Sequence, residues 1–368
     1  MSKNIVQADN VTMSAGGLYS LATIGAKDVI DKSIPRVLEA IDNIELQGNE
    51  HWNFSDMGCA DGGTSLDLWR SVTRHCRQKR QNDIQIVYAD QARNDFNALV
   101  GILHGLTQFE SYLHELPHVH AIESGSSFYQ PILPRHSLHL GFSATAMHWL
   151  RGAPTNISNH VHMVGAEGDE LKAFEQQGRE DWAAILLHRA RELKPGGRLV
   201  LINFCQDEQG RYLGNTGGVN MFNNFNANWQ SFLADGTISE QEYQGMTLPQ
   251  YYNTVDEFSA PLLDKNSDVY KAGLRLESIK TAVVPCPFAE DFKQHGDANK
   301  FAKAYIPTIR SWNESVFAGA LSADRSQQER SELIEAYYQR YQDQVAENPE
   351  GHGMGYVHAY MTIAKEAD

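Results

Sequence analysis

Short apolar runs alternate with amphipathic stretches between residues 53 and about 205, and this alternation limits the possible folds sharply. Four apolar runs indicate strands, at residues 53–57, 84–89, 137–142 and 198–204. Patterns with helical spacing lie between them, at residues 65–78, 94–106 and 182–193. The last pattern stops at a Lys-Pro-Gly-Gly sequence, residues 194–197, which we expect to be a turn. Such alternation predicts an α/β fold with a mainly parallel, seven-stranded sheet and helices on both faces.

The segment 215–320 differs from the preceding part of the chain in amino-acid composition and pattern. It is rich in Asn, Gln and aromatic residues, and Gly and Pro interrupt its short helical runs. We expect it to form a largely helical cap over the sheet together with residues 1–45. Residues 46–214 with 321–368 are then expected to form the α/β core.

The formal net charge of −15 limits the partners of this chain. Nucleic-acid binders need a basic face that neutralises phosphates, and the charge as a whole argues against one. One basic run extends from Arg70 to Arg80, and we interpret it as the solvated face of a helix. We therefore expect a small-molecule partner and no nucleic acid.

The cysteines and the apolar runs bear on location. Cys59, Cys76, Cys205 and Cys286 lie far apart without a C-x-x-C pair, a pattern typical of reduced thiols. The N-terminus lacks the apolar run of a signal peptide, and no stretch approaches 18 apolar residues. We expect a soluble cytoplasmic protein that does not associate with membranes.

A glycine-containing turn follows the first expected strand. Gly58 and Gly62 lie between that strand and the next helical pattern, where they allow a tight turn and close approach of a ligand. The spacing is neither the G-x-G-x-x-G of dinucleotide-binding enzymes nor a Walker loop. It predicts a nucleotide-bearing ligand across the carboxyl ends of the strands, although a plain strand–turn–helix connection gives a similar sequence.

Two further segments suit such a ligand. Asp90 ends the second expected strand, where a carboxylate can accept hydrogen bonds from both ribose hydroxyls. It also precedes a helical pattern, so it is a candidate helix N-cap as well, and the two roles are compatible. In the third segment, Ser127 and Phe128 offer a hydroxyl and a ring to an adenine, but an ordinary turn would explain them as well.

With these segments in place, the chain resembles the SABATH methyltransferases, the family of salicylic acid carboxyl methyltransferases and caffeine synthases. The matching segments occur in the family's order, and they are Asp56-Met57-Gly58-Cys59, Asp90 with Asn94-Asp95-Phe96-Asn97, Ser127-Phe128-Tyr129, Ser137-Leu138-His139 with His148-Trp149-Leu150, Leu193-Lys194-Pro195-Gly196-Gly197-Arg198, and Pro249-Gln250-Tyr251. The resemblance implies a Rossmann-like class I methyltransferase fold and S-adenosylmethionine as cofactor, with S-adenosylhomocysteine as its product. It also implies a possible homodimer.

The resemblance also implies roles in cofactor and substrate binding for particular residues of this chain. Asp56 would hold the methionine part of the cofactor, Asp90 with Gln91 the ribose, and Ser127 with Phe128 the adenine. Tyr19 and Thr23 would close over the cofactor, near Gly58 and Thr64. Trp149 would donate its indole N–H to a substrate carboxylate. The other residues implied to line the acceptor pocket are Tyr19, Ala26, Met147, His148, Phe222, Ile309 and Trp312.

Several features depart from the family. Thr145 and Phe142 replace the Tyr and His of its H-S-S-Y motif, and the glycine-rich N-terminal loop is shorter. The residue that matches the family's carboxylate-binding Gln is Ala26, which has no donor, and Lys27 beside it is a candidate replacement for binding an anion. A carboxylic acid with a solution pKa of roughly 4–5 is ionised at neutral pH, so its methylation needs no general base. We therefore predict methyl ester formation on a small organic acid.

Alternatives to carboxyl methylation remain at this stage. A phenol or a ring nitrogen of a small heterocycle could be the acceptor, with His148 as the base, or the chain could be an inactive homologue that only binds cofactor. Two histidine pairs, His118 with His120 and His160 with His162, have no carboxylate or Cys at ligand spacing in the sequence. We therefore expect no metal site.

Overall fold

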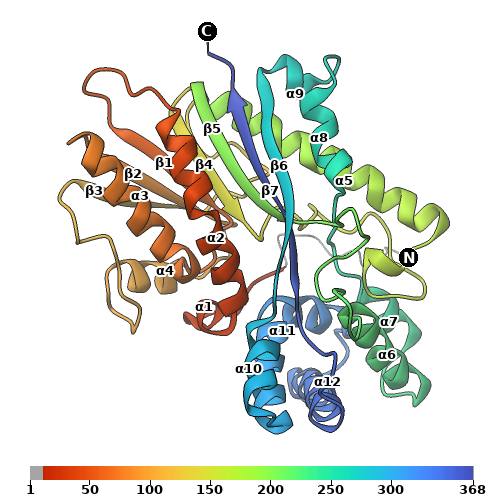
Figure 1. The fold of residues 1–368 in the computed structure, drawn as a ribbon. Helices are drawn as coiled ribbons and strands as arrows, with labels where there is room; N and C mark the ends of the chain where they lie inside the picture. Colours follow the sequence, from red (N-terminus) through yellow and green to blue (C-terminus); the bar gives the residue numbers. More distant parts are fainter. Residues whose placement is uncertain (1–10, 368) are drawn as a thin grey trace.

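A computed structural model describes residues 11–367 as an α/β fold built on a seven-stranded sheet (Figure 1). The strand order is β3-β2-β1-β4-β5-β7-β6. Strands β3, β2, β1, β4 and β5 run parallel to one another, and β7 pairs antiparallel with both β5 and β6. The expected seven-stranded, mainly parallel sheet is confirmed. Its strands are β1 (Trp52–Met57), β2 (Ile84–Ala89), β3 (Val119–Ser124), β4 (Leu138–Ala144), β5 (Leu193–Phe204), β6 (Leu274–Val284) and β7 (Tyr356–Lys365).

Helices cover the sheet on both faces. The longer helices, with their bounds, are α2 (Ile24–Asp42), α3 (Leu66–Lys79), α5 (Gly168–Glu192), α6 (Met221–Ala234), α11 (Ala298–Ala320) and α12 (Gln327–Glu347). The shorter ones are α1 (Leu18–Ala22), α4 (Phe96–Leu103), α7 (Glu240–Gly245), α8 (Val255–Leu263), α9 (Asp268–Lys271) and α10 (Pro287–His295), with 3-10 turns at Gly63–Ser65 and Met163–Gly165.

The pleat of β5 shows how the two faces are filled. Leu199 and Leu201 pack in a cluster with residues of α5, α8 and β7, whereas Val200 and Ile202 pack in the larger cluster with residues of α2 and α3. Successive side chains of a strand point to opposite faces, so a strand buried on both sides needs an unbroken apolar run. This is why the central strands were recognisable in the sequence.

A group of helices lies beyond the edge at which the parallel strands end. Figure 1 shows α6, α7, α10, α11 and α12 together below the sheet, and α11 packs against α12. The contents of this group differ from the expected cap. Strand β6, together with α8 and α9, comes from the segment 215–320 but packs with the sheet, whereas α12 comes from the segment expected to belong to the core. Residues 1–10 of the expected cap lie outside the described residues.

Two local predictions need correction. Helix α5 begins at Gly168 rather than near residue 182, and the Lys-Pro-Gly-Gly sequence belongs to β5 instead of forming a separate turn. The β4–β5 register shifts there, so the sequence forms an irregularity within a paired strand. Strand β3 was missed because it is an edge strand with many polar and half-exposed residues.

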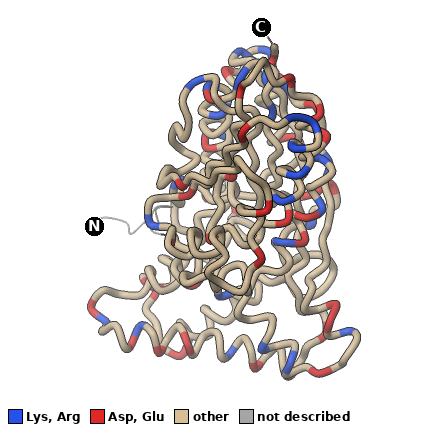
Figure 2. The backbone as a smooth tube through the Cα atoms, turned by 90° about the vertical axis from the view of Figure 1, so that its left-hand side faces the viewer, with Lys and Arg blue, Asp and Glu red and all other residues tan. Residues whose placement is uncertain are grey.

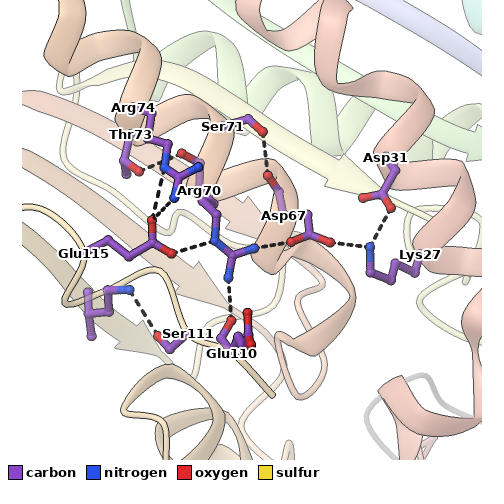
Figure 3. Close-up of polar contacts among 11 residues, drawn as sticks. Lys27, Asp31, Asp67, Arg70, Ser71, Thr73, Arg74, Glu110, Ser111 and Glu115 are labelled. Carbon is purple, nitrogen blue, oxygen red and sulfur yellow. Dashed lines mark hydrogen bonds and ion pairs between the residues drawn. The ribbon is translucent and has the colours of Figure 1, made fainter. Parts of the chain in front are cut away.

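Several cations of the basic run from Arg70 to Arg80 pair with nearby acids. Figure 3 shows Arg70 between Asp67 and Glu115, with its Nε atom 2.7 Å from Glu115 Oε1. Arg74 donates to the same Glu115 at 2.6 Å. Over the whole described chain, Lys and Arg positions are interspersed with Asp and Glu (Figure 2). Arg74 and Lys79 are exposed on α3, in agreement with the solvated helix face expected from the sequence, and part of the charge of the run is paired.

The described residues also bear on membranes, thiols and metals. Within residues 11–367, no helix is long and apolar enough to cross a membrane. All four cysteines are buried and unpaired. Among the same residues, no group of His, Cys, Asp and Glu is arranged to hold a metal ion. His118 and His120 instead lie 3.7 Å and 4.0 Å from carboxylate oxygens of Asp83, which the sequence spacing did not reveal.

Candidate active site

The turn after β1 depends on glycine. Gly58 has φ 77°, and a Cβ atom added there would lie 2.4 Å from the Cβ of Ala146. Gly62 has φ 75°, and an added Cβ would lie 2.5 Å from Leu99 Cδ1. Both positions therefore combine a left-handed backbone with a lack of space. The turn brings the backbone of Gly58 and Ala60 to the wall of a cavity.

Asp90 lies at the end of β2 on the same cavity. Its Oδ2 accepts a hydrogen bond from the Ala60 N–H at 2.8 Å, and its Oδ1 accepts one from the Gln91 N–H at 2.7 Å. Each oxygen still has a lone pair for a ligand. Burial raises the pKa of Asp90 to about 6. The N-cap of α4 is Asp95, which accepts from the Ala98 N–H, so the helix-cap interpretation of Asp90 is wrong.

Asp56 is not on the cavity surface. It is buried beneath the turn, and its Oδ2 accepts hydrogen bonds from Ser65 Oγ at 2.7 Å and from Trp69 Nε1 at 2.8 Å. Burial raises its pKa to about 6. These contacts tie β1 to the start of α3. Asp56 therefore contributes to the shape of the turn, and the structure does not bring its side chain to the lining.

Asp61 connects the turn to the N-terminal helix. Its carboxylate accepts hydrogen bonds from the backbone N–H of Ser20, at 3.0 Å, and from the Ser20 hydroxyl. This contact seats α1, which carries Tyr19, on the turn. Among the described residues, Asp56, Asp61 and Asp90 have only neutral hydrogen-bond donors and no Lys, Arg or His partner. Of these three carboxylates, Asp90 lines the cavity, and its charge favours a cationic or hydrogen-bond-donating ligand there.

The cavity is continuous from the glycine turn to a wall of aromatic residues. The space free of protein atoms inside it and at its mouth is about 1030 Å³, part of which is open to solvent. Thr145, in its wall, is a β-branched residue with φ 55°. Strained residues of this kind cluster at functional sites. The lining residues are Val11, Met13, Tyr19, Thr23, Ala26, Gly58, Ala60, Asp90, Gln91, Ser127, Phe128, Tyr129, Thr145, Ala146, His148, Trp149, Phe204, Leu213, Gln250, Trp312, Met354 and Tyr356.

His148 and Trp149 lie in the aromatic wall. The His148 ring lies 4.7 Å from the Phe204 ring and 5.5 Å from the Trp149 ring. Burial lowers the pKa of His148 to about 3, so its imidazole is neutral at physiological pH. Its Nδ1 is buried without a partner among the described residues. On the same wall, burial raises the pKa of Tyr19 to about 12, so its hydroxyl stays protonated.

Most of the residues predicted from the sequence meet in this cavity. Those that line it are Tyr19, Thr23, Ala26, Gly58, Asp90, Gln91, Ser127, Phe128, His148, Trp149 and Trp312. Five others, Asp56, Thr64, Met147, Phe222 and Ile309, are buried but do not line it. The Phe222 ring, for example, stacks on the His162 ring at 3.8 Å and lies behind the wall.

Several lining residues were missed. Phe204 ends β5 and Tyr356 begins β7, and the antiparallel pairing of these strands puts both at the same edge of the sheet. Gln250 lies in the Pro-Gln-Tyr segment, which matches the family in sequence but was assigned no role in the site. Its lining position depends on a loop contact that no periodic pattern predicts.

Comparison with known proteins identifies the family. Residues 19–366 match the family described as SAM dependent carboxyl methyltransferases, where SAM denotes S-adenosylmethionine. The chain belongs to this family. It is similar to the loganic acid O-methyltransferase of Catharanthus roseus, with 22% identity over 313 residues, 74% of this chain and 81% of that protein. It is also similar to the farnesoic acid carboxyl-O-methyltransferase of Arabidopsis thaliana, with 25% identity over 280 residues, 70% of this chain and 74% of that protein.

A solved structure supports the fold. The structure of a loganic acid methyltransferase with S-adenosylhomocysteine superposes with a TM-score of 0.71 at 18% identity, covering 97% of this chain and 99% of that one. As a carboxyl methyltransferase, the protein is an enzyme that uses S-adenosylmethionine to methylate the carboxylate of a small organic acid. The residues around the turn fit this cofactor, since Gly58 and the Asp90 carboxylate line the cavity and Asp90 has no Lys, Arg or His partner among the described residues.

Proposed function

We propose that the cavity holds the methyl donor at the Asp90 end and the acceptor acid at the Trp149 end. The observation that carries this assignment is that one continuous cavity contains both groups of residues. A single cavity is what direct transfer requires, because the reacting atoms must come within about 3–3.5 Å of each other in line. The experiment that tests it is transfer of a labelled methyl group from S-adenosylmethionine to loganic, gibberellic and farnesoic acids, for which relatives are named.

At the donor end, Asp90 is proposed to accept hydrogen bonds from the two ribose hydroxyls with its remaining lone pairs. Phe128 and Ser127 are proposed to contact the adenine by its face and its edge. Gln91, Tyr19 and Thr23 complete this part of the lining. S-adenosylmethionine supplies a methyl group that its sulfonium charge has already activated.

At the acceptor end, Trp149 is proposed to orient the carboxylate with its indole N–H. The residue is half-buried, and its Nε1 donates to no other described residue. The surrounding wall of Phe204, Trp312 and Tyr356 excludes water, which strengthens a hydrogen bond to an anion. These residues align and desolvate an acceptor oxygen that needs no proton removed. A small acid with an apolar body fits this arrangement.

Substitution of Trp149 by Phe tests the orienting role. The variant keeps an apolar ring in the wall but loses the N–H donor. We expect kcat/KM for an accepted acid to fall about 10-fold, the lower end of the range for a hydrogen bond to a charged group. Steady-state kinetics provide the measurement, and S-adenosylhomocysteine affinity, expected to stay unchanged, is the control. Full activity of the variant on every accepted acid would contradict the role.

The pH dependence separates a carboxylate from a phenol or a ring nitrogen. A carboxylic acid is fully ionised above pH 7. His148 is neutral in the same range, because burial lowers the pKa of its imidazole to about 3. We therefore expect kcat/KM for the acid to stay flat from roughly pH 7 to 9. A base of such low pKa is also poorly matched to deprotonating a phenol. A rate that rises tenfold per pH unit across this range would point to a phenolic or heterocyclic acceptor instead.

An inactive, cofactor-binding role is less well supported. The turn at Gly58, the carboxylate of Asp90 and the indole of Trp149 all lie on the same cavity, so the parts that transfer requires are together. The cytoplasmic location and the homodimer expected from the sequence remain predictions.

A further inference from the structure

Gln250 lies directly opposite Trp149 in a short antiparallel pairing. The Leu150 N–H donates to the Pro249 carbonyl at 2.8 Å, and the Tyr251 N–H donates to the His148 carbonyl at 2.9 Å. Side chains of directly opposed residues leave the ladder on the same face, with Cβ atoms about 4.5–5.5 Å apart. Both side chains line the cavity. The indole and the amide are therefore neighbours on one wall.

The hydrogen bonds around Gln250 fix which way its amide faces. His162 is buried, which keeps its pKa well below the usual value and its ring neutral, with one N–H. Its Nδ1 accepts from the Val164 N–H at 3.4 Å, so the proton is on Nε2, which lies 3.2 Å from Gln250 Oε1. Tyr252 Oη donates to the same oxygen at 3.2 Å.

With Oε1 turned toward His162 and Tyr252, the Nε2 of Gln250 faces the other way. Gln250 is 1% exposed, yet its Nε2 donates to no described residue and is not fully enclosed by protein atoms. The remaining surface of this amide nitrogen is therefore on the cavity that the residue lines. An N–H₂ group in this position can donate to an acceptor atom of a ligand that enters the cavity.

We propose that Gln250 Nε2 and Trp149 Nε1 bind the acceptor carboxylate as a pair of donors, an inference that rests on the proposed function. Two other candidates for the second donor do not serve. Ala26 lines the cavity with a methyl group alone. Lys27 is held away by ion pairs with Asp31 at 2.6 Å and Asp67 at 2.5 Å, as Figure 3 shows.

A pair of donors has consequences for selectivity. A carboxylate presents two oxygens that share its charge, whereas a phenol or a ring nitrogen presents one acceptor atom. In the methyl ester, the charge is gone and one oxygen carries the methyl group, so the same pair of donors holds the product less well than the acid. Gln250 thus favours binding of the acid and release of the ester.

The test compares three variants on an acid that the wild type methylates, chosen from loganic, gibberellic, farnesoic and benzoic acids. Gln250→Leu removes the donor, and Gln250→Glu keeps an acceptor for His162 and Tyr252 but places a negative charge toward the acid. Tyr252→Phe is the matched control, because it removes one bond to Oε1 and leaves the Nε2 donor in place. We expect KM for the acid to rise about 10-fold in Gln250→Leu and further in Gln250→Glu. In Tyr252→Phe it should change less than about twofold.

Two further readouts accompany the KM comparison. Affinity for S-adenosylhomocysteine should be the same in all four proteins. For the wild type, the inhibition constant of the ester should be larger than the dissociation constant of the acid. If the wild type methylates an acid but Gln250→Leu and Tyr252→Phe have equal KM values, the role of Gln250 is wrong and the proposed function stands. If the wild type methylates none of the acids and accepts a phenol or heterocycle, both are wrong.

Discussion

Replacement of Asp90 by Ala is expected to weaken binding of S-adenosylhomocysteine on the order of 100-fold. Each hydrogen bond to a charged group contributes about 1.5–3 kcal/mol, and two ribose hydroxyls at the lower end of that range give about 3 kcal/mol. Calorimetric titration of the folded variant provides the measurement. Asp95→Ala is the matched control, because Asp95 follows the same strand but caps α4 rather than lining the cavity. That change should cost about 1 kcal/mol of stability and leave affinity unchanged.

The same carboxylate gives cofactor binding a pH dependence. Burial raises the pKa of Asp90 from its usual value to about 6 in the protein without ligand. Ribose hydroxyls that donate to the ionised form are favoured above this pH, so affinity should decline as the pH falls below about 6 and by at most tenfold per pH unit. In Asp90→Ala this decline should be absent. Unchanged affinity in a folded Asp90→Ala protein would show that another group binds the ribose.

Comparison of Asp90 with Asp56 shows what the sequence could and could not predict. Both residues were assigned to the cofactor, each at the end of an apolar strand that was located to within a residue. The direction of a side chain depends on how each strand end is packed, and this is not encoded by apolar periodicity. Asp90 turns to the cavity, whereas Asp56 turns to Ser65 and Trp69 of the following helical segment. The fold and the edge of the site were predictable, but not the orientation of every acid.

Residues of the acceptor end were harder to predict for a second reason. Tyr356 reaches the cavity through the antiparallel pairing of β7 with β5, and Gln250 reaches it through the bridge to Trp149. Both contacts join segments that are far apart in the chain. Strand β6, half-exposed at the edge of the sheet, was likewise taken as part of a helical cap. Local pattern identifies elements well when both faces are buried, and less well at edges and in loops.

The loop that carries Ser127 and Phe128 is held by a buried ion pair on α5. Arg189 and Glu192 have no exposed surface, and Arg189 Nε lies 2.8 Å from Glu192 Oε2. The guanidinium also donates to the carbonyl oxygens of Phe128 and Gln130, at 3.0 Å and 2.9 Å. Glu192 in turn accepts from the Ile132 N–H at 2.6 Å. The pair therefore satisfies backbone groups of the loop on both sides.

Substitution of Arg189 by Met is expected to lower the free energy of unfolding by about 3–5 kcal/mol, because it leaves Glu192 buried and uncompensated. Urea denaturation measures this, and Arg191→Met, at an exposed position of the same helix, should stay within about 0.5 kcal/mol of the wild type. The double variant Arg189→Met with Glu192→Leu should regain part of the loss, since it removes the unpaired charge. It should not regain full S-adenosylhomocysteine affinity, because the carbonyls of Phe128 and Gln130 still lack their donor. If the free energy of unfolding of Arg189→Met falls by less than about 1 kcal/mol, water or a rearranged loop compensates the charge of Glu192. The Arg189–Glu192 ion pair would then not determine the position of Phe128.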